Sequence, residues 1–213
     1  MEILEKLFGS SARVKILRLF LFNHEEVFEP KEIGLRVQVR LPLVRKELSL
    51  LNKIGIIKQI TVTREISLKG KTKKHKKKKV LVWRLEPSFV YRAALENLLI
   101  NMIPLSSKRL VNRFDKVGRM KLIIVAGVFI QEWDHSRVDV LLVGDRIKAS
   151  VAERAVRALE ADIGRELRFA LFETQDFLYR LGVCDRLIRD ILEYPHERIL
   201  DKLGVDEPKD VIV

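Results

Sequence analysis

The chain has 213 residues, of which 47% are hydrophobic and 33% charged, and its formal net charge is +12. These proportions are typical of a globular protein and exclude a collagen-like or disordered chain. The one cysteine, Cys184, excludes a disulfide scaffold and favours a reducing, cytoplasmic location. The first residues lack a basic segment followed by an apolar one, so we expect no secretory signal. The longest apolar run, residues 122–130, is too short to span a membrane, so we expect no membrane partner.

The basic residues are concentrated in the first part of the chain. Residues 1–118 contain 26 Lys and Arg against 11 Asp and Glu, whereas residues 119–213 contain 15 against 18. The density is highest in residues 69–79, where eight of eleven positions are lysine. This asymmetry predicts that the first part contacts a polyanion and that the second part has another role.

Two helices are predicted within the first 40 residues. The first begins after a cap at Ser10 or Ser11, because a hydroxyl can accept a hydrogen bond from an unpaired N–H of the first turn. The second covers residues 30–37 and begins at Pro30. Proline has no backbone N–H, and at the first position of a helix this costs nothing, because an N–H there would have no partner within the helix.

A third helix is predicted from near Pro42 to the residue before Gly55, a residue type that suits the end of a helix. Its buried face is a narrow apolar stripe of Leu41, Val44, Leu48 and Leu51. The opposite face is polar and basic, with side chains that suit base edges and phosphates. The candidate DNA-binding residues here are Arg40, Arg45, Lys46, Ser49, Asn52 and Lys53.

The pattern then changes to that of a β-hairpin. Residues 56–68 are β-branched and partly alternating, residues 80–85 form a second strand, and Gly70 lies in the turn between them. Trp83 is expected in the core. The tip is rich in lysine, whose flexible ammonium groups suit phosphates irrespective of base sequence. The candidate phosphate-binding residues are Lys69, Lys71, Lys73, Lys74, Lys76, Lys77, Lys78 and Lys79.

Three helices followed by a β-hairpin make up the winged helix-turn-helix layout. The segments E-K-L-F-G-S-S-A-R-V-K-I-L-R-L-F and V-R-K-E-L-S-L-L-N-K-I-G-I-I-K resemble the winged-helix transcriptional regulators of prokaryotes, over residues 1–87. The resemblance implies a regulator that binds double-stranded DNA, with the helix near residues 41–54 in the major groove and the lysine-rich wing, residues 69–79, on phosphates. The alternatives are a solvated helix face without a ligand, and RNA as the partner.

Residues 88–118 are predicted to form a helical connector. Residues 89–102 are apolar at helical spacing, Pro104 interrupts the pattern, and a second helical piece covers residues 105–116. An apolar helix of this kind can form the seam of a homodimer, which we expect here, or can pack on its own domain.

Residues 119–213 are predicted to form a small α/β domain, which places the whole chain in the α+β class. The predicted elements are, in order, strands at 121–128 and 138–143, a helix at 149–163, a strand at 166–172, a helix capped by Thr174 and a last helix that begins at Asp185.

The order of these elements resembles the minimal nucleotidyltransferase fold of the polymerase-β superfamily. In that family a Gly-Ser pair follows the first strand, and an Asp-hydrophobic-Asp motif and a later carboxylate hold two Mg²⁺ ions. Here Gly127 lacks the serine after it, Arg137 stands at the first Asp position, and Asp139 is kept. The third acid would fall near Arg168 or Ala170. One carboxylate beside an arginine does not suit Mg²⁺, so the resemblance implies a degenerate domain.

We therefore predict a protein that is not an enzyme and that has no metal and no cofactor. The degenerate domain would serve dimerisation, or the binding of a ligand or protein partner. The alternative is an active nucleotidyltransferase whose winged helix binds nucleic acid, which requires further acidic residues beside Asp139.

Overall fold

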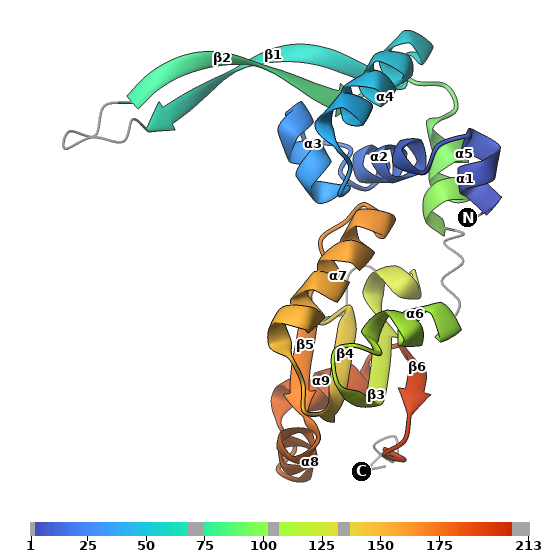
Figure 1. Ribbon diagram of the computed structural model, residues 1–213, viewed down its shortest axis with the longest axis vertical. Coiled ribbons are helices and arrows are strands. Elements are labelled where there is room, and N and C mark those ends of the chain that lie inside the picture. Colours follow the sequence, from blue (N-terminus) through green and yellow to red (C-terminus); the bar gives the residue numbers. More distant parts are fainter. Residues whose placement is uncertain (1–2, 68–74, 102–106, 132–136, 206–213) are drawn as a thin grey trace, which may run out of the picture. The chain divides into compact units, whose positions relative to one another are not determined.

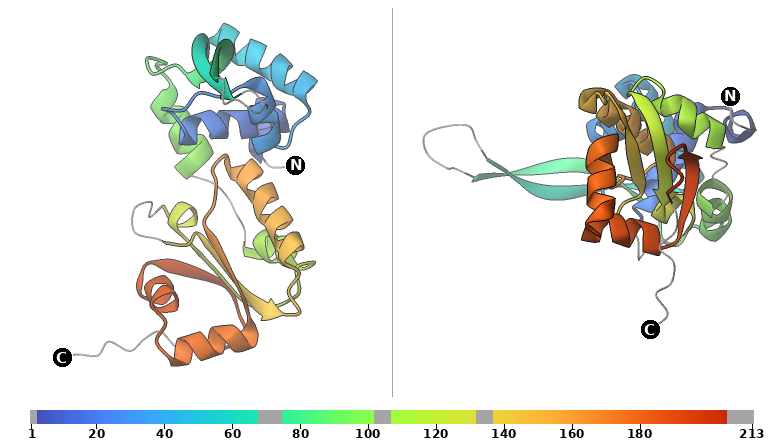
Figure 2. Two further views of the ribbon diagram at one scale, coloured as in Figure 1. Left: turned by 90° about the vertical axis from the view of Figure 1, so that its left-hand side faces the viewer. Right: turned by 90° about the horizontal axis from the view of Figure 1, so that it is seen from below.

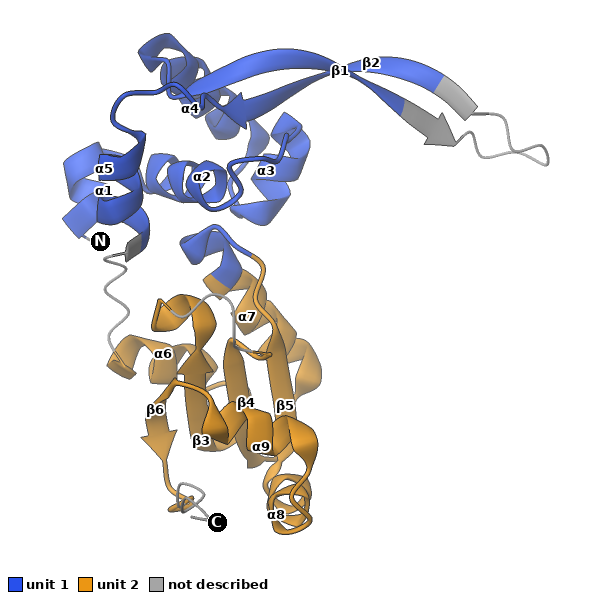
Figure 3. Cartoon of the chain, turned by 180° about the vertical axis from the view of Figure 1, so that it is seen from behind, with its two compact units in different colours: residues 1–102, 160–165 blue, residues 103–159, 166–213 orange. Residues whose placement is uncertain are grey.

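The structure is a computed structural model of the α+β class, and it describes residues 3–67, 75–101, 107–131 and 137–205 (Figure 1). The chain divides into two compact units, each with a hydrophobic core of its own (Figure 3). Unit 1 comprises residues 1–102 and 160–165, and unit 2 comprises residues 103–159 and 166–213. Among the described helices, none combines the length and the apolar character needed to cross a membrane.

Four helices surround the core of unit 1. They are α1 (Ile3–Phe8), α2 (Ser11–Phe22), α3 (Pro30–Arg36) and α4 (Leu41–Ile54). The predicted cap of α2 is confirmed at Ser10, whose hydroxyl oxygen accepts a hydrogen bond from the backbone N–H of Arg13 at 3.2 Å. The predicted start of α3 at Pro30 is also confirmed. In the core, Phe20 and Phe28 are fully buried and pack edge to face.

Helix α4 has the apolar stripe and the ending that its sequence predicts. Val44, Leu48 and Leu51 are buried, whereas Leu41 at the beginning of the helix is only half-buried. Gly55 ends the helix with a φ of 83°, a left-handed conformation that glycine adopts without steric cost.

An ion pair with a buried carboxylate joins α2 to α4. Arg13 Nε donates to Glu47 Oε2 at 2.8 Å, and Arg13 Nη1 donates to the carbonyl oxygen of Phe8 at 2.6 Å. The Glu47 side chain is only 4% exposed. A carboxylate there has lost its hydration and depends on its partner, so the pair opposes any rotation of α4 that would separate them.

Strands β1 (Ile57–Ser67) and β2 (His75–Leu85) form an antiparallel hairpin that extends away from the helices of unit 1 (Figure 1). Its base is held by Trp83, which is buried as predicted and exchanges backbone hydrogen bonds of 2.9 and 2.8 Å with Phe28.

The prediction that the lysines from Lys76 to Lys79 lie in the hairpin tip is wrong. They belong to β2, which begins five residues earlier than predicted. The physical reason is the partner strand: β1 continues to Ser67, so its backbone groups pair with residues 75–79 despite the low strand propensity of lysine. The predicted tip residues Lys69, Lys71, Lys73 and Lys74 lie outside the described residues.

The continuous helix predicted for residues 89–102 is also wrong. Helix α5 (Arg92–Glu96) begins later and passes into a π-helical turn, η1 (Asn97–Asn101). Ahead of it the chain turns locally, as the Ser88 hydroxyl donates to Glu86 Oε1 at 2.8 Å. That hydrogen bond, with a weaker one from the Ser88 N–H, lowers the pKa of Glu86. Leu99 in η1 is fully buried in the core of unit 1, so this segment packs on its own unit.

Unit 2 is built on a mixed four-stranded sheet in the order β5-β4-β3-β6. Strand β3 is antiparallel to β4 and β6, and β4 is parallel to β5. The left view of Figure 2, along the sheet edge, shows α6 and α7 on one face of this sheet and α9 on the other. The elements are α6 (Ser107–Phe114), β3 (Arg119–Ala126), the 3₁₀ turn η2 (Gly127–Phe129), β4 (Val140–Asp145), α7 (Ala149–Ile163), β5 (Phe169–Glu173), α8 (Thr174–Gly182), α9 (Arg186–Glu193) and β6 (His196–Asp201).

Two features of unit 2 differ from the sequence-based expectation. Strand β6 is not predicted, because its sequence H-E-R-I-L-D is largely charged and lacks the apolar alternation of a strand with one buried face. Thr174 does not cap α8: it is the first helical residue, and Glu173 stands at the cap. The predicted beginning of α9 at Asp185 is confirmed: the Asp185 carboxylate caps the helix by accepting from the N–H of Leu187 at 2.9 Å.

The Arg13–Glu47 pair leads to a stability prediction. We expect Glu47→Ala to lower the free energy of unfolding of unit 1 by about 2 kcal/mol, because the mutation leaves the Arg13 guanidinium without its charged partner. Urea denaturation followed by tryptophan fluorescence measures this effect. The protein has two tryptophans, so a Trp133→Phe background leaves the buried Trp83 as the reporter. Glu25→Ala is the control, since that side chain is 90% exposed; equal losses in the two variants would contradict the prediction.

Candidate nucleic-acid interface

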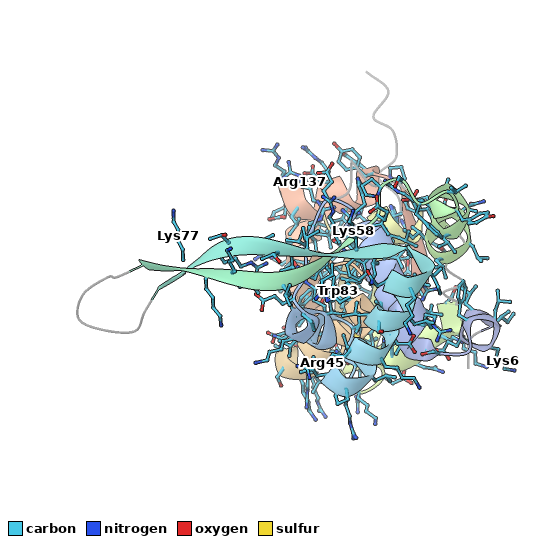
Figure 4. The ribbon with its side chains drawn as sticks, turned by 90° about the horizontal axis from the view of Figure 1, so that it is seen from above. Lys6, Arg45, Lys58, Lys77, Trp83 and Arg137 are labelled. Carbon is cyan, nitrogen blue, oxygen red and sulfur yellow. The ribbon has the colours of Figure 1, made fainter. Side chains whose placement is uncertain are left out.

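The outer face of α4 presents the polar and basic side chains that its sequence predicts. All six candidates on and before this helix are exposed: Arg40, Arg45, Lys46, Ser49, Asn52 and Lys53. Within the part of the chain that the structure describes, none of the four cations has a carboxylate oxygen within 4.0 Å. Among the described residues, therefore, no ion pair neutralises the charge of these four side chains. Figure 4 shows where Arg45 lies on α4.

The turn between α3 and α4 is tight and has a defined conformation. Gln38 has a φ of 52°, and the N–H of Val39 donates to the carbonyl oxygen of Gly34 at 3.0 Å. A side chain at position 34 would be crowded by Val39, because a Cβ on Gly34 would lie only 3.0 Å from the carbonyl oxygen of Val39. This close approach brings the end of α3 against the beginning of α4 and fixes the direction in which α4 leaves the turn.

A groove of about 590 Å³ lies beside this turn, and sequence reasoning did not find it. It is lined by the first turn of α2, the α3–α4 turn and the beginning of α4: Ser10, Ser11, Ala12, Lys15, Gln38, Val39, Arg40, Pro42 and Leu43. Three segments that are distant in sequence form it, so no local pattern could have predicted it. Its position next to Arg40 places it at the edge of the basic face of α4.

The hairpin adds a second set of cations. Lys77, Lys78 and Lys79 are exposed in β2. Lys76 lies in β2 as well, but its side chain is outside the described part. Sequence analysis missed the cations of β1 because it assigned only strand structure there. Lys58 lies 4.0 Å from Glu86, and Arg64 forms an ion pair of 2.9 Å with Glu29.

The three residues that the sequence comparison with nucleotidyltransferases singles out lie in unit 2: Gly127 directly follows β3, and Arg137 and Asp139 lie just before β4. Gly127 begins η2 with a φ of 56°. Asp139 Oδ2 accepts from the backbone N–H of Arg168 at 2.8 Å and from its Nε at 3.4 Å. Arg137 Nε lies 2.9 Å from Asp190 Oδ2 on α9. Sequence analysis did not foresee either pairing, because both join positions on different elements.

These pairings limit the chemistry open to Asp139 and Arg137, because each side chain already has a partner in the protein. The Asp139 side chain is 9% exposed, and one of its oxygens is occupied by two donors from Arg168. Arg137 is in turn engaged by the carboxylate of Asp190. Among the described residues, no group of three His, Cys, Asp or Glu side chains is placed to hold a metal ion.

Comparison of the chain with protein-family models, with curated proteins and with solved structures found no match. The function is therefore inferred from the charge and geometry of the chain itself.

The Asp139 bridge predicts a local effect on unit 2. We expect Asp139→Ala to speed amide exchange in β4 and β5 by roughly 10–100-fold, because the N–H and guanidinium of Arg168 lose their acceptor. Hydrogen–deuterium exchange with mass spectrometry separates this effect from unit 1. Asp139→Asn keeps an acceptor for the N–H and should have a smaller effect. Asp176→Ala, at an exposed helix pair, is the control; exchange no faster in Asp139→Ala than in this control would contradict the prediction.

Proposed function

We propose that unit 1 is a winged helix-turn-helix domain and that the protein is a cytoplasmic transcriptional regulator that binds double-stranded DNA. The observation that carries the proposal is the exposed face of α4, where Arg45, Lys46 and Lys53 lie beside Ser49 and Asn52 without an ion pair among the described residues. Arginine and asparagine can each hydrogen-bond to a base edge in two places, and lysine binds phosphates. A helix with this face enters the major groove.

The arrangement of unit 1 supports this proposal. The short α3 and the tight turn at Gln38 precede α4, and the hairpin follows it directly after Gly55. The hairpin carries Lys77, Lys78 and Lys79 as further phosphate contacts. Phosphate contacts position a protein on the duplex, whereas base contacts select the sequence, so the two elements have different tasks.

For unit 2 we propose a degenerate nucleotidyltransferase-like domain without catalytic activity. The order β5-β4-β3, with β4 antiparallel to β3 and parallel to β5, supports the likeness in fold. The Asp139–Arg168 and Arg137–Asp190 pairs support a role other than catalysis, because each commits a motif residue to a partner within the protein. The role that remains is dimerisation, or the binding of a ligand or a protein.

We further propose that the protein acts as a homodimer. Ile3 and Leu7 lie one turn apart on α1 and are 84% and 68% exposed. Val90 and Tyr91, just before α5, are 86% and 67% exposed. Large apolar side chains exposed to this degree are stabilised when a second copy covers them.

The test of the proposed function is a selection from random duplex DNA at near-physiological salt, with the full chain. We expect enrichment of an inverted repeat with half-sites about one helical turn apart, as a dimer requires. Salt-sensitive retention of all duplexes without enrichment would contradict sequence-specific regulation. Tighter binding of structured RNA than of duplex DNA at the same salt would favour the RNA alternative instead.

The role of Arg45 in base recognition makes a separate prediction. We expect Arg45→Ala to weaken binding to the selected duplex by about 5–100-fold, the range for one lost base contact, and to weaken binding to random duplex much less. Fluorescence anisotropy with both duplexes measures the difference. Lys6→Ala is the control, because Lys6 is exposed on α1. An equal loss on both duplexes would show that Arg45 contacts only phosphate.

A further inference from the structure

We propose that unit 2 binds the phosphate backbone of the DNA through a surface of its own, which we call the basic end of the sheet. This surface lies at the opposite end of β3 and β4 from Gly127 and Asp139. The inference rests on the proposed duplex partner of unit 1, and it names the ligand of unit 2. The basic end consists of five exposed cations: Lys116, Arg119, Arg146, Lys148 and Lys202.

The register of the sheet places these cations at one end of unit 2. Arg119 is the first residue of β3 and is paired with Asp145, the last residue of β4. Lys202 directly follows β6, and its N–H donates to the carbonyl oxygen of Lys121 at 2.8 Å. Strand β3 has eight residues, so at about 3.3 Å per residue Arg119 lies roughly 25 Å from Gly127. The basic end is therefore separate from the residues that resemble the nucleotidyltransferase motif.

Two segments in backbone contact carry four of the five cations: one leads into β3, and the other runs from β4 to α7. The N–H of Lys148 donates to the carbonyl oxygen of Val117 at 2.8 Å. Gly118 has no room for a side chain, because a Cβ there would lie 2.8 Å from the carbonyl oxygen of Asp145. This close approach brings the cations of both segments onto one surface. They are Lys116 and Arg119 in the first segment, and Arg146 and Lys148 in the second.

The second segment contains a strained turn that a carboxylate holds. Arg146 has a φ of 55°, a left-handed conformation that is costly for a residue other than glycine. The Glu173 carboxylate accepts from the N–H of Arg146 at 3.1 Å and from the N–H of Ile147 at 2.8 Å. Both oxygens of Glu173 are thus engaged by the backbone, and this acid fixes the turn without forming an ion pair with its cations.

Ion pairs do not neutralise the basic end within the described part of the chain. None of its five cations has a described carboxylate oxygen within 4.0 Å. Two further acids at this end have other partners: Asp145 lies 3.9 Å from Lys121, and Asp201 accepts from two backbone N–H groups at 2.9 Å. Asp115 is exposed beside Lys116 and offsets one charge. Positive charge therefore remains that an external anion can neutralise.

Two exposed arginines on helices of unit 2 differ from the basic end in this respect. Arg157 lies 3.7 Å from Glu153 on α7, and Arg189 lies 3.6 Å from Glu193 on α9. Each pair joins residues one helical turn apart, so the helix supplies the counter-charge itself. Unit 2 thus contains exposed cations of both kinds, paired and unpaired, and the unpaired ones of the basic end are the candidates for ligand contacts.

A chain of phosphates suits this surface better than a single phosphate group. Neighbouring strands of a sheet are about 4.8 Å apart, so the adjacent ends of β4, β3 and β6 span roughly 10 Å. Duplex DNA carries one negative charge per about 1.7 Å of helix axis, so it presents several phosphates over this distance. Lysine and arginine contact phosphates irrespective of the base sequence. The basic end therefore adds affinity for the duplex without adding sequence preference.

The experiment measures how the affinity of the full chain for a random 40-base-pair duplex depends on salt, by fluorescence anisotropy. Two double variants each remove two cations of the basic end: Arg119→Gln with Lys148→Gln, and Lys116→Gln with Lys202→Gln. Each double variant loses two phosphate contacts, so we expect the plot of log affinity against log salt to flatten by about 2.

The matched control is the double variant Arg157→Gln with Arg189→Gln. It lowers the charge of unit 2 by the same amount, but both arginines are already paired with carboxylates. We expect the control to keep the salt slope of the wild type. Unchanged amide exchange in β3 and β4 shows that unit 2 remains folded in each variant, and two variants of different residues guard against the misfolding of one.

Two outcomes overturn this inference and leave the proposed function intact. Either folded variants of the basic end keep the wild-type salt slope, or the control flattens the slope as much as they do, so that net charge alone explains the effect. In both cases the full chain still enriches a motif in the selection from random duplex DNA. A wild-type chain that binds neither selected nor random duplex overturns the proposed function and the inference together.

Discussion

The orientation of α4 about its own axis is the constraint on which the proposed interface depends. Two interactions set it from the same side of the helix: the packing of Val44, Leu48 and Leu51 in the core, and the ion pair of buried Glu47 with Arg13. Rotating α4 by a quarter turn would expose the apolar side chains of its stripe and separate Glu47 from Arg13. The outward direction of Arg45, Ser49 and Asn52 is therefore a consequence of what the opposite face must bury.

The electrostatic organisation of unit 1 follows from where its acids lie. Glu47 is buried and forms an ion pair with Arg13, and Glu29 forms an ion pair with Arg64 of the hairpin. The cations of α4 and the outer lysines of β2 have no such partner among the described residues. Positive charge thus remains on the outer face of α4 and on the outer part of β2, which supports the proposal of a polyanionic partner.

In unit 2, by contrast, two arginines are paired with carboxylates. Arg168 forms an ion pair with Asp139, and Arg137 forms one with Asp190. A carboxylate that coordinates Mg²⁺ must not be neutralised by a cation of the protein itself, so these two pairs support the proposal that unit 2 is not catalytic. In the degenerate domain that we propose, the fold is independent of Asp139 and Arg137, because the sheet is held by backbone pairing and apolar packing.

The sequence by itself determined the local structure wherever one strong signal acts within a few residues. The Ser10 cap, the Pro30 start, the Gly55 ending and the stripe of α4 each depend on the chemistry of neighbouring residues, and the structure confirms them. The polar face of α4 was visible in the sequence for the same reason. The tertiary structure decided what depends on distant partners. Residues 75–79 became strand because β1 continues opposite them, and β6 formed because β3 offered a free edge to a charged segment. The pairings Arg13–Glu47 and Asp139–Arg168, and the groove beside the α3–α4 turn, join elements separated by tens of residues. No local pattern encodes such contacts, since they arise only when packing brings the elements together.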